Sequence, residues 1–251
     1  MSIRLLVFAP TRRAPTETFV RANLQGLPFD ITAYFGDERP FSDLGRLAYG
    51  LAILLSKGLT RLGLLRAATL PGSLVALLLI RRHQPDVLMA EFGFHAVRVM
   101  EATAWSDIPL VVHFRGSDAS AQSRLGLLKE RYRRLMEIVS GVIVKSQPMR
   151  RRLLVLGAPD DHLIVSPSGA DDRLFHSADP GTAAPLFVAV GRFVAKKGPL
   201  ETIQAFAAMR QTLPKSEAAK TNLVMVGDGP LLPRARELVE ELGLENVVSL
   251  P

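Results

Sequence analysis

Residues 190–199 read VGRFVAKKGP, and an apolar run at 186–190 leads into them. Glycine ends that run, arginine and lysine follow, and a Gly-Pro pair opens an amphipathic stretch that continues to residue 211. Proline at the first position of a helix costs no hydrogen bond. The free N–H groups and the dipole at such a helix start favour an anion. The segment therefore predicts a strand, an anion-binding loop and a helix in succession.

The same alternation of short apolar runs and amphipathic stretches extends through the whole chain. Near-continuous apolar strands separated by helices indicate parallel sheets covered on both faces. The expected strands are 3–8, 31–35, 86–90, 110–114, 141–144, 162–165, 186–190, 222–226 and 247–250. The expected helices are 17–27, 44–57, 70–82, 94–105, 122–139, 148–156, 199–211 and 232–242.

A small, polar, Pro- and Gly-bearing break at 177–182 divides this pattern and is typical of a linker. We therefore expect an α/β protein with two Rossmann-like domains, at residues 1–180 and 181–251. The second ends on a strand with no helix to cover it, which favours an incomplete domain over a compact closing subdomain.

Composition narrows the classes of function. The chain has 251 residues, a net charge of +7 and no cysteine, so it has no disulfides and fits a reducing cytoplasm. The longest apolar run, at 74–80, is too short for a membrane helix. The basic excess could attract nucleic acid, anionic lipid or an anionic substrate, or it could be a solvated face. An aromatic content of 6% and the lack of a matching module argue against nucleic acid.

Two basic regions leave a choice open. The helices expected within 44–82 carry arginine and lysine beside leucine, which suits either an interfacial helix or ordinary core packing. The runs at 129–134 and 150–152 suit either membrane docking or solvated helix faces.

The cations of the opening segment have a candidate ligand. Arg192 offers a flat fork for phosphate oxygens, and Lys197 adds a mobile point charge. Together they could hold a diphosphate without a metal, although surface cations beside a turn remain the alternative. Ligands also collect where parallel strands end, so residues 10–17, 91–95, 114–118 and Ser146 are expected to line a cleft in the first domain. The sequence after the expected first strand argues against a dehydrogenase, because it lacks the Gly-x-Gly-x-x-Gly motif that binds a dinucleotide.

Several segments together resemble family 4 glycosyltransferases, which have the GT-B fold. The resemblance covers nearly all of the chain and is specific only in combination. Segments 15–20 and 114–118 look like the branch that builds exopolysaccharides such as colanic acid. The segments that carry the family resemblance are 149–157, 165–171, 190–199, 223–230 and 242–248.

The resemblance implies retaining transfer of a hexose from a nucleotide diphosphate sugar to a saccharide or lipid-linked acceptor, with no metal cofactor. It implies a cytoplasmic enzyme with an anionic membrane surface as a candidate partner. The donor diphosphate would be held by Arg192 and Lys197 beside Gly191 and Gly227. The remaining substrate-binding candidates face the cleft; they are Thr16, Glu17, Glu91 and Gly116.

The catalytic candidates are His113, Arg115 and Asp118. Arg115 stands where many relatives have histidine in a His-Gly-x-Asp type motif. It could bind an anionic group or form an ion pair with Asp118. His113 is expected on the other side of the strand and is not expected to replace that histidine. No residue is identified as a general base. The front-face attack that the resemblance implies does not need one, because the leaving phosphate takes the proton of the acceptor.

The family's Glu-x7-Glu motif, which contacts donor sugar and ribose, would lie beyond Pro251. We therefore expect little turnover from the 251-residue form. A nucleotide-sugar epimerase of similar fold and a non-catalytic sugar-nucleotide binder are the alternative functions.

Overall fold

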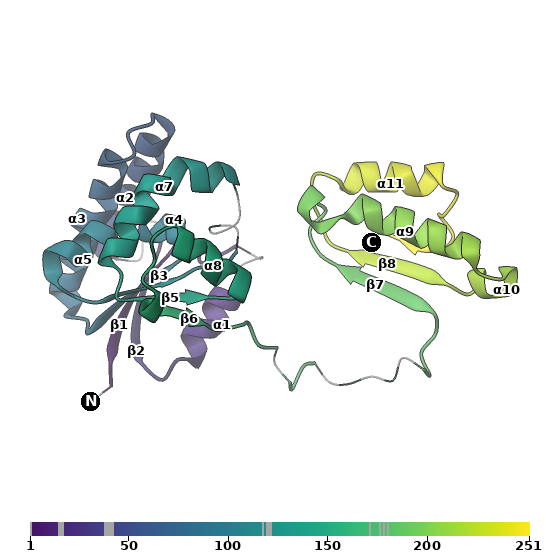
Figure 1. Ribbon diagram of the computed structural model, residues 1–251, viewed down its shortest axis with the longest axis horizontal. Coiled ribbons are helices and arrows are strands. Elements are labelled where there is room, and N and C mark those ends of the chain that lie inside the picture. The colour runs from purple at the N-terminus through teal and green to yellow at the C-terminus, as the bar shows by residue number, and fades with distance from the viewer. Residues whose placement is uncertain are drawn as a thin grey trace. The chain divides into compact units, whose positions relative to one another are not determined.

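The computed structural model describes residues 2–14, 18–37, 43–116, 118, 122–170, 172–175, 177, 179 and 181–251, with backbone only for 18 and 122–125. The chain forms two compact units, Met1–Gly169 and Ala170–Pro251 (Figure 1). The sequence predicts this division after residue 180, whereas the compact units divide after Gly169. Each unit is described by itself below.

The N-terminal unit is built on a six-stranded parallel sheet. Its strands are β1 (Arg4–Ala9), β2 (Asp30–Phe35), β3 (Val87–Glu91), β4 (Leu110–His113), β5 (Gly141–Val144) and β6 (Leu163–Val165). They lie in the order β2-β1-β3-β4-β5-β6, and every neighbouring pair is parallel. The expected strands are confirmed to within one or two residues, because each is a short run rich in apolar residues. The four central strands β1, β3, β4 and β5 are largely buried on both faces.

Helices cover both faces of this sheet. They are α1 (Thr18–Gly26), α2 (Leu44–Arg61), α3 (Leu70–His83), α4 (Gly93–Ala96), α5 (Met100–Ser106), α7 (Gln122–Ile138) and α8 (Gln147–Val155), with 3-10 turns η2 (Ala67–Thr69) and η3 (Asp160–His162). The single helix expected at 94–105 is wrong, because the segment forms α4 and α5. Between them, Val99 has φ −121° and ψ −5°, outside the helical region, and its N–H donates to the carbonyl three residues back.

The sheet reverses its strand order around β1, because β2 follows β1 on one side and β3 returns on the other. Such a switch point leaves a crevice at the carboxyl ends of the two strands, and ligands bind there in open α/β sheets. The core beneath it is closely buried: Leu6, Leu88 and Val112 are at most 1% exposed, and Phe8 and Tyr49 of the same cluster are fully buried. Burial of each such side chain contributes about 1.5–3 kcal/mol, which fixes the strand ends that carry the polar residues.

The C-terminal unit is a three-stranded parallel sheet in the order β7-β8-β9. Its strands are β7 (Leu186–Val190), β8 (Asn222–Val226) and β9 (Val248–Ser249), and its helices are η4 (Ala195–Lys197), α9 (Pro199–Thr212), α10 (Lys215–Ala218) and α11 (Leu232–Glu241). Buried side chains of α9 and α11 share one core with β8 and β9, so both helices cover the same face. Most of β7 is exposed instead, namely Leu186, Phe187, Val188 and Val190.

Candidate functional site

The connections after β7 and β8 are joined by backbone hydrogen bonds. The N–H of Gly191 donates to the carbonyl of Val226 at 3.0 Å, and the N–H of Phe193 donates to that of Asp228 at 2.9 Å. The N–H of Leu231 donates a hydrogen bond to the carbonyl of Phe193 at 3.0 Å. Both connections follow the carboxyl ends of their strands, so they form one rigid platform at that edge of the sheet.

Two glycines let these connections approach so closely. Gly227 has φ 153°, and a Cβ there would sit 1.9 Å from the carbonyl oxygen of Gly191. Gly229 also has φ 153°, and its Cβ would lie 2.5 Å from the carbonyl oxygen of Phe193. Gly191 differs, because no atom lies within 4 Å of its Cβ position. Gly227 therefore serves the packing, whereas Gly191 leaves open space beside the platform.

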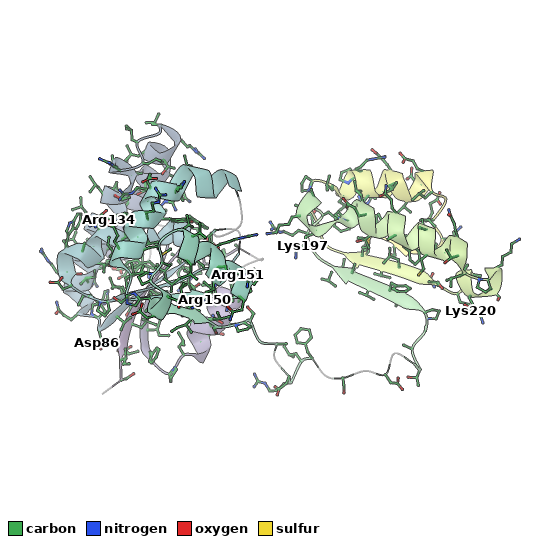
Figure 2. All side chains as sticks on the ribbon, viewed as in Figure 1. Asp86, Arg134, Arg150, Arg151, Lys197 and Lys220 are labelled. Carbon is green, nitrogen blue, oxygen red and sulfur yellow. The ribbon has the colours of Figure 1, made fainter. Side chains whose placement is uncertain are left out.

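Arg192 and Lys197 stand exposed on this platform. No ion pair of either is recorded with any described residue, so both charges are available to an anion. Lys197 ends η4, and Gly198, at φ 61°, turns the chain into α9 with Pro199 at its first position. Figure 2 shows Lys197 extending outward from this end of the C-terminal unit. The amino end of a 14-residue helix adds a partial positive charge to the two cations.

Glu201 is a neighbour of this site that the sequence analysis missed. It lies in the first turn of α9, and a Cβ on Gly198 would sit 3.5 Å from its Oε2. Glutamate three residues after the cap residue is a recognised helix-start signal, so its spacing from Gly198 could have identified it. Its carboxylate stabilises the helix start when no other anion is bound there.

The N-terminal unit holds a buried ion pair between neighbouring strands. Arg115 donates from Nε and Nη2 to the two carboxylate oxygens of Glu91, both at 2.8 Å. The Glu91 side chain is fully buried and that of Arg115 is 4% exposed. Burial raises the pKa of Glu91, and the hydrogen bonds from Arg115 oppose that rise. The guanidinium also lies 4.7 Å from the ring centroid of Phe19 on α1.

The partner of Arg115 is therefore Glu91 and not Asp118. Asp118 is fully buried and accepts hydrogen bonds from backbone N–H groups instead. Those of Gly93, Arg115 and Gly116 reach its carboxylate at 3.0, 3.0 and 2.8 Å. The side chain thus ties the connection after β3 to the one after β4. Its neighbours in the chain, 117 and 119–121, lie outside the described residues.

His113 faces the same carboxylate as Arg115, so the expectation that it lies on the other side of the strand is wrong. Side chains alternate along a strand, and residues two apart share a face. His113 Nδ1 is 3.8 Å from Glu91 Oε2. Burial, followed by repulsion from Arg115 and Lys145, lowers the pKa of His113 to about 3. The imidazole is neutral near pH 7, so its contact with Glu91 is not an ion pair.

The connection after β3 carries backbone strain. Phe92 has φ 70°, which is costly for a phenylalanine, and a Cβ on Gly93 would lie 2.2 Å from the ring of Phe114. The N–H of Phe92 donates to the carbonyl of His113 at 2.9 Å, which holds the strained residue in place.

A cavity of about 370 Å³ lies at the carboxyl end of β1. Pro10 and Thr11 line it together with His95 from the segment after β3, as expected for the switch point. His95 accepts or donates a 2.6 Å hydrogen bond with the Tyr49 hydroxyl, and burial lowers its pKa well below the usual range. The other lining residues are Ile53, Lys57, Thr60, Leu65, Ala68, Thr69, Phe94, Val97, Arg98, Leu127 and Leu128.

Comparison with known families assigns both units. The family model described as Glycosyltransferase Family 4 matches residues 25–174, and the model described as Glycosyl transferases group 1 matches residues 172–251. The chain belongs to glycosyltransferase family 4. The resemblance drawn from the sequence is therefore confirmed at the level of the family.

Curated relatives of this family 4 glycosyltransferase carry a consistent name. Colanic acid biosynthesis glycosyltransferase WcaL of Salmonella typhimurium is 26% identical over 170 residues, and the Escherichia coli K12 protein of the same name is 29% identical over 171. Each match covers 66% of this chain and 41% of the relative's length. An exopolysaccharide branch of the family fits these relatives.

Solved structures of similar fold include Anabaena HepE in complex with UDP and glucose, with a TM-score of 0.61 and 16% identity over all of this chain and 69% of that one. A glycosyltransferase from Rickettsia africae has a TM-score of 0.63 and 15% identity over 100% of this chain and 68% of its own. At these identities the likeness shows the fold alone, and it confirms the expected α/β fold of the GT-B type.

The structure gathers the predicted site residues of this glycosyltransferase into two clusters, one in each unit. Gly191, Arg192, Lys197 and Gly227 meet on the platform after β7 and β8, and the roles predicted for them stay predictions. Thr16 and Glu17 lie outside the described residues. In the N-terminal unit the predicted residues that lie together are Glu91, His113, Arg115, Gly116 and Asp118.

Lys145 and the cavity cations Lys57 and Arg98 were missed as site residues. Lys145 follows β5, and burial lowers its pKa, with Arg115 adding repulsion. No motif along the chain marks these three positions, because the residues lie on separate elements. The described residues contain no cluster of three or more His, Cys, Asp or Glu side chains that could hold a metal ion.

A pH dependence follows from the buried His113. Its pKa lies near 3 when folded and near 6.5 when unfolded, so the unfolded chain takes up a proton that the folded one refuses. Stability is fully present above pH 6.5 and is lost as the pH falls toward 3. Between about pH 7.5 and 5.5, His113 alone lowers the unfolding free energy by about 1.4 kcal/mol.

Urea unfolding at the two pH values measures this loss. Trp105 is the only tryptophan and lies in α5, so its fluorescence reports on the N-terminal unit. The His113→Gln variant should lose about 1.4 kcal/mol less than the wild type over this range. Equal losses in the two proteins would show that His113 is protonated at its ordinary pKa.

Proposed function

We propose that the protein is a retaining hexosyltransferase of polysaccharide biosynthesis. It would move a hexose from a nucleotide diphosphate sugar to a saccharide or lipid-linked acceptor, without a metal cofactor, at the cytoplasmic face of a membrane. The observation that carries the proposal is the pair of exposed cations, Arg192 and Lys197, beside the start of α9 in a family 4 chain. Relatives named for colanic acid biosynthesis and similar folds solved with UDP and UDP-glucose support it.

The platform suits the charge that develops during transfer. Negative charge builds on the diphosphate as the bond to the sugar breaks, and fixed positive groups stabilise that change electrostatically. Arg192 would hold two phosphate oxygens with its planar fork, and Lys197 would supply a point charge. The open space beside Gly191 would let phosphate oxygens approach the backbone.

The hydroxyl of the acceptor would attack from the same face of the sugar that the diphosphate leaves. The departing phosphate oxygen then takes the hydroxyl proton, so the enzyme needs no separate base. A mechanism without a separate base agrees with the N-terminal unit, because its carboxylates Glu91 and Asp118 are buried and already hydrogen-bonded. We place the acceptor at the cavity after β1, where Lys57 and Thr60 offer polar contacts.

Calorimetric titration with UDP, GDP and ADP tests the donor site. Arg192→Gln and Lys197→Gln should each raise the Kd of the best-bound nucleotide about tenfold or more, because each removes a charged hydrogen bond to phosphate. Lys220→Gln is the matched control, since this exposed lysine follows α10 at the other end of the unit from Lys197 (Figure 2). Unchanged affinity in both site variants would refute the donor site.

Incubation with nucleotide sugars separates the function classes. Transfer to an acceptor, or slow hydrolysis that releases the diphosphate, supports the transferase. Epimerised donor would identify an epimerase. Binding without any turnover fits either a sugar-nucleotide binder or the low turnover expected of the 251-residue form.

A further inference from the structure

Leucines on α2 and α3 point away from the core of the N-terminal unit. On α2 and just after it, Leu44, Leu51, Leu55 and Leu62 recur at spacings of seven, four and seven residues, so they line one stripe of the helix. On α3, leucine recurs every four residues. All are exposed, up to 77% at Leu44; the full set is Leu44, Leu51, Leu54, Leu55, Leu62, Leu64, Leu70, Leu74 and Leu78. We call this set the leucine face.

The buried sides of α2 and α3 carry large apolar residues together with small and polar ones. The buried residues are Tyr49, Gly50, Ala52, Ile53 and Ser56 on α2, and Gly72, Ser73, Ala76, Leu79 and Ile80 on α3. A Cβ on Gly72 would lie 2.4 Å from the carbonyl oxygen of Arg98, which shows how closely α3 packs on the unit. This helix pair is therefore apolar on its exposed side as well as on its buried side, unlike a helix that faces water. Burial in the core does not account for the leucine face, and such a set of exposed apolar side chains marks an interaction site.

The charges around the leucine face have one sign. Between Leu44 and His83 the chain has no aspartate or glutamate, although it has 24 of them in all. Arg82 approaches Asp43 at 3.7 Å, just outside this segment. The cations of the segment are Arg46, Lys57, Arg61, Arg66, Arg81 and Arg82. An apolar surface on a segment whose own charges are all positive complements an anionic lipid surface rather than a typical protein surface of mixed charge.

The other basic region has a different character. On α7, Arg131 pairs with Glu101 at 2.8 Å, and Arg133 and Arg134 pair with Glu130 and Glu137. On α8, Arg150 pairs with Asp160. Most of these positive charges are therefore paired with nearby carboxylates, so this region attracts an anionic bilayer less strongly.

We propose that the leucine face of α2 and α3 docks this protein on an anionic bilayer. The leucines would enter the boundary between headgroups and acyl chains, and Arg61 and Arg66 would meet lipid phosphates. No helix in the described part of the chain is long and apolar enough to cross a membrane, so the helices would lie along the surface. Figure 1 shows α2 and α3 side by side on the N-terminal unit, and the cavity that Lys57 and Thr60 line adjoins them.

This inference deepens the proposed function, because a lipid-linked acceptor is presented at such a surface. The test needs no donor, so the two can fail separately. Co-sedimentation is measured with vesicles of phosphatidylcholine alone and with phosphatidylglycerol added. Binding to the anionic vesicles should be about tenfold stronger or more, and it should weaken as salt is raised.

Two double variants test the two chemical parts. Leu51→Gln with Leu55→Gln should lower the partition coefficient about tenfold or more, and Arg61→Gln with Arg66→Gln should do the same at low salt. The matched controls are Val155→Gln, which alters an 86% exposed residue of α8, and Arg151→Gln with Arg152→Gln. Neither control should change binding.

Three results would overturn the proposal. The first is equal binding to the two kinds of vesicle. The second is unchanged binding in the leucine variant, with the loss appearing in the α8 controls. The third is a wild-type oligomer that the leucine variant disperses, without vesicle binding by either protein, which would make the leucine face a contact between proteins.

Discussion

Replacing Gly227 with alanine is expected to unfold the C-terminal unit. The new Cβ would sit 1.9 Å from the carbonyl oxygen of Gly191, and the φ of 153° at this position disfavours any L side chain. Relaxation is blocked, because the N–H of Gly191 is bonded to Val226 directly before the substitution. Clash and strain together should cost about 4 kcal/mol or more, which is most of the stability of a small unit.

Amide hydrogen exchange followed by mass spectrometry measures this effect, since all the tyrosines and the tryptophan lie in the other unit. Peptides from β7 and β8 should lose their protection in Gly227→Ala, whereas peptides from β1 to β6 keep theirs. Gly191→Ala is the matched control, because open space surrounds its Cβ position, and protection should stay as in the wild type. Retained protection of β7 and β8 in Gly227→Ala would contradict the close approach of the two connections.

Replacing Arg115 with methionine should destabilise the N-terminal unit by about 3–5 kcal/mol, because it leaves the fully buried Glu91 without its partner. Burial, the largest cause of the low pKa of His113, remains when Arg115 is removed, so protonation of the imidazole offers little compensation. Urea unfolding followed by Trp105 fluorescence measures the loss.

The control for this substitution is Arg133→Met. Arg133 pairs with Glu130 at 2.8 Å on the surface of α7, and such exposed pairs contribute about 1 kcal/mol at most. If Arg115→Met and Arg133→Met cost the same, the Glu91–Arg115 pair does not hold the ends of β3 and β4 together. A second substitution, Glu91→Gln, should recover part of the stability lost in Arg115→Met, because it removes the unpaired charge.

Most of the fold was predictable from the sequence because its strands are short runs rich in apolar residues that alternate with amphipathic stretches. The platform in the C-terminal unit was predictable for the same reason, since Gly191 and Gly227 each follow such a run. The helix expected at 94–105 was not, because the apolar pattern continues through Val99 while the backbone leaves the helical region there.

The partner of Arg115 could be identified only from the register of the sheet. Glu91 and His113 are aligned between β3 and β4, and nothing along the chain indicates that these distant residues meet. Recognising the leucine face required the burial of each residue. Apolar residues lie on both sides of α2, and periodicity alone does not tell which of them pack on the unit and which are exposed.

The most direct test of the donor site compares a nucleoside diphosphate with its monophosphate. Affinities are measured by calorimetry for whichever of uridine, guanosine and adenosine binds best. The wild type should prefer the diphosphate about tenfold or more, and this preference should vanish in the double variant Arg192→Gln, Lys197→Gln while the monophosphate affinity changes much less. A preference that persists undiminished in the double variant would show that the diphosphate is held elsewhere.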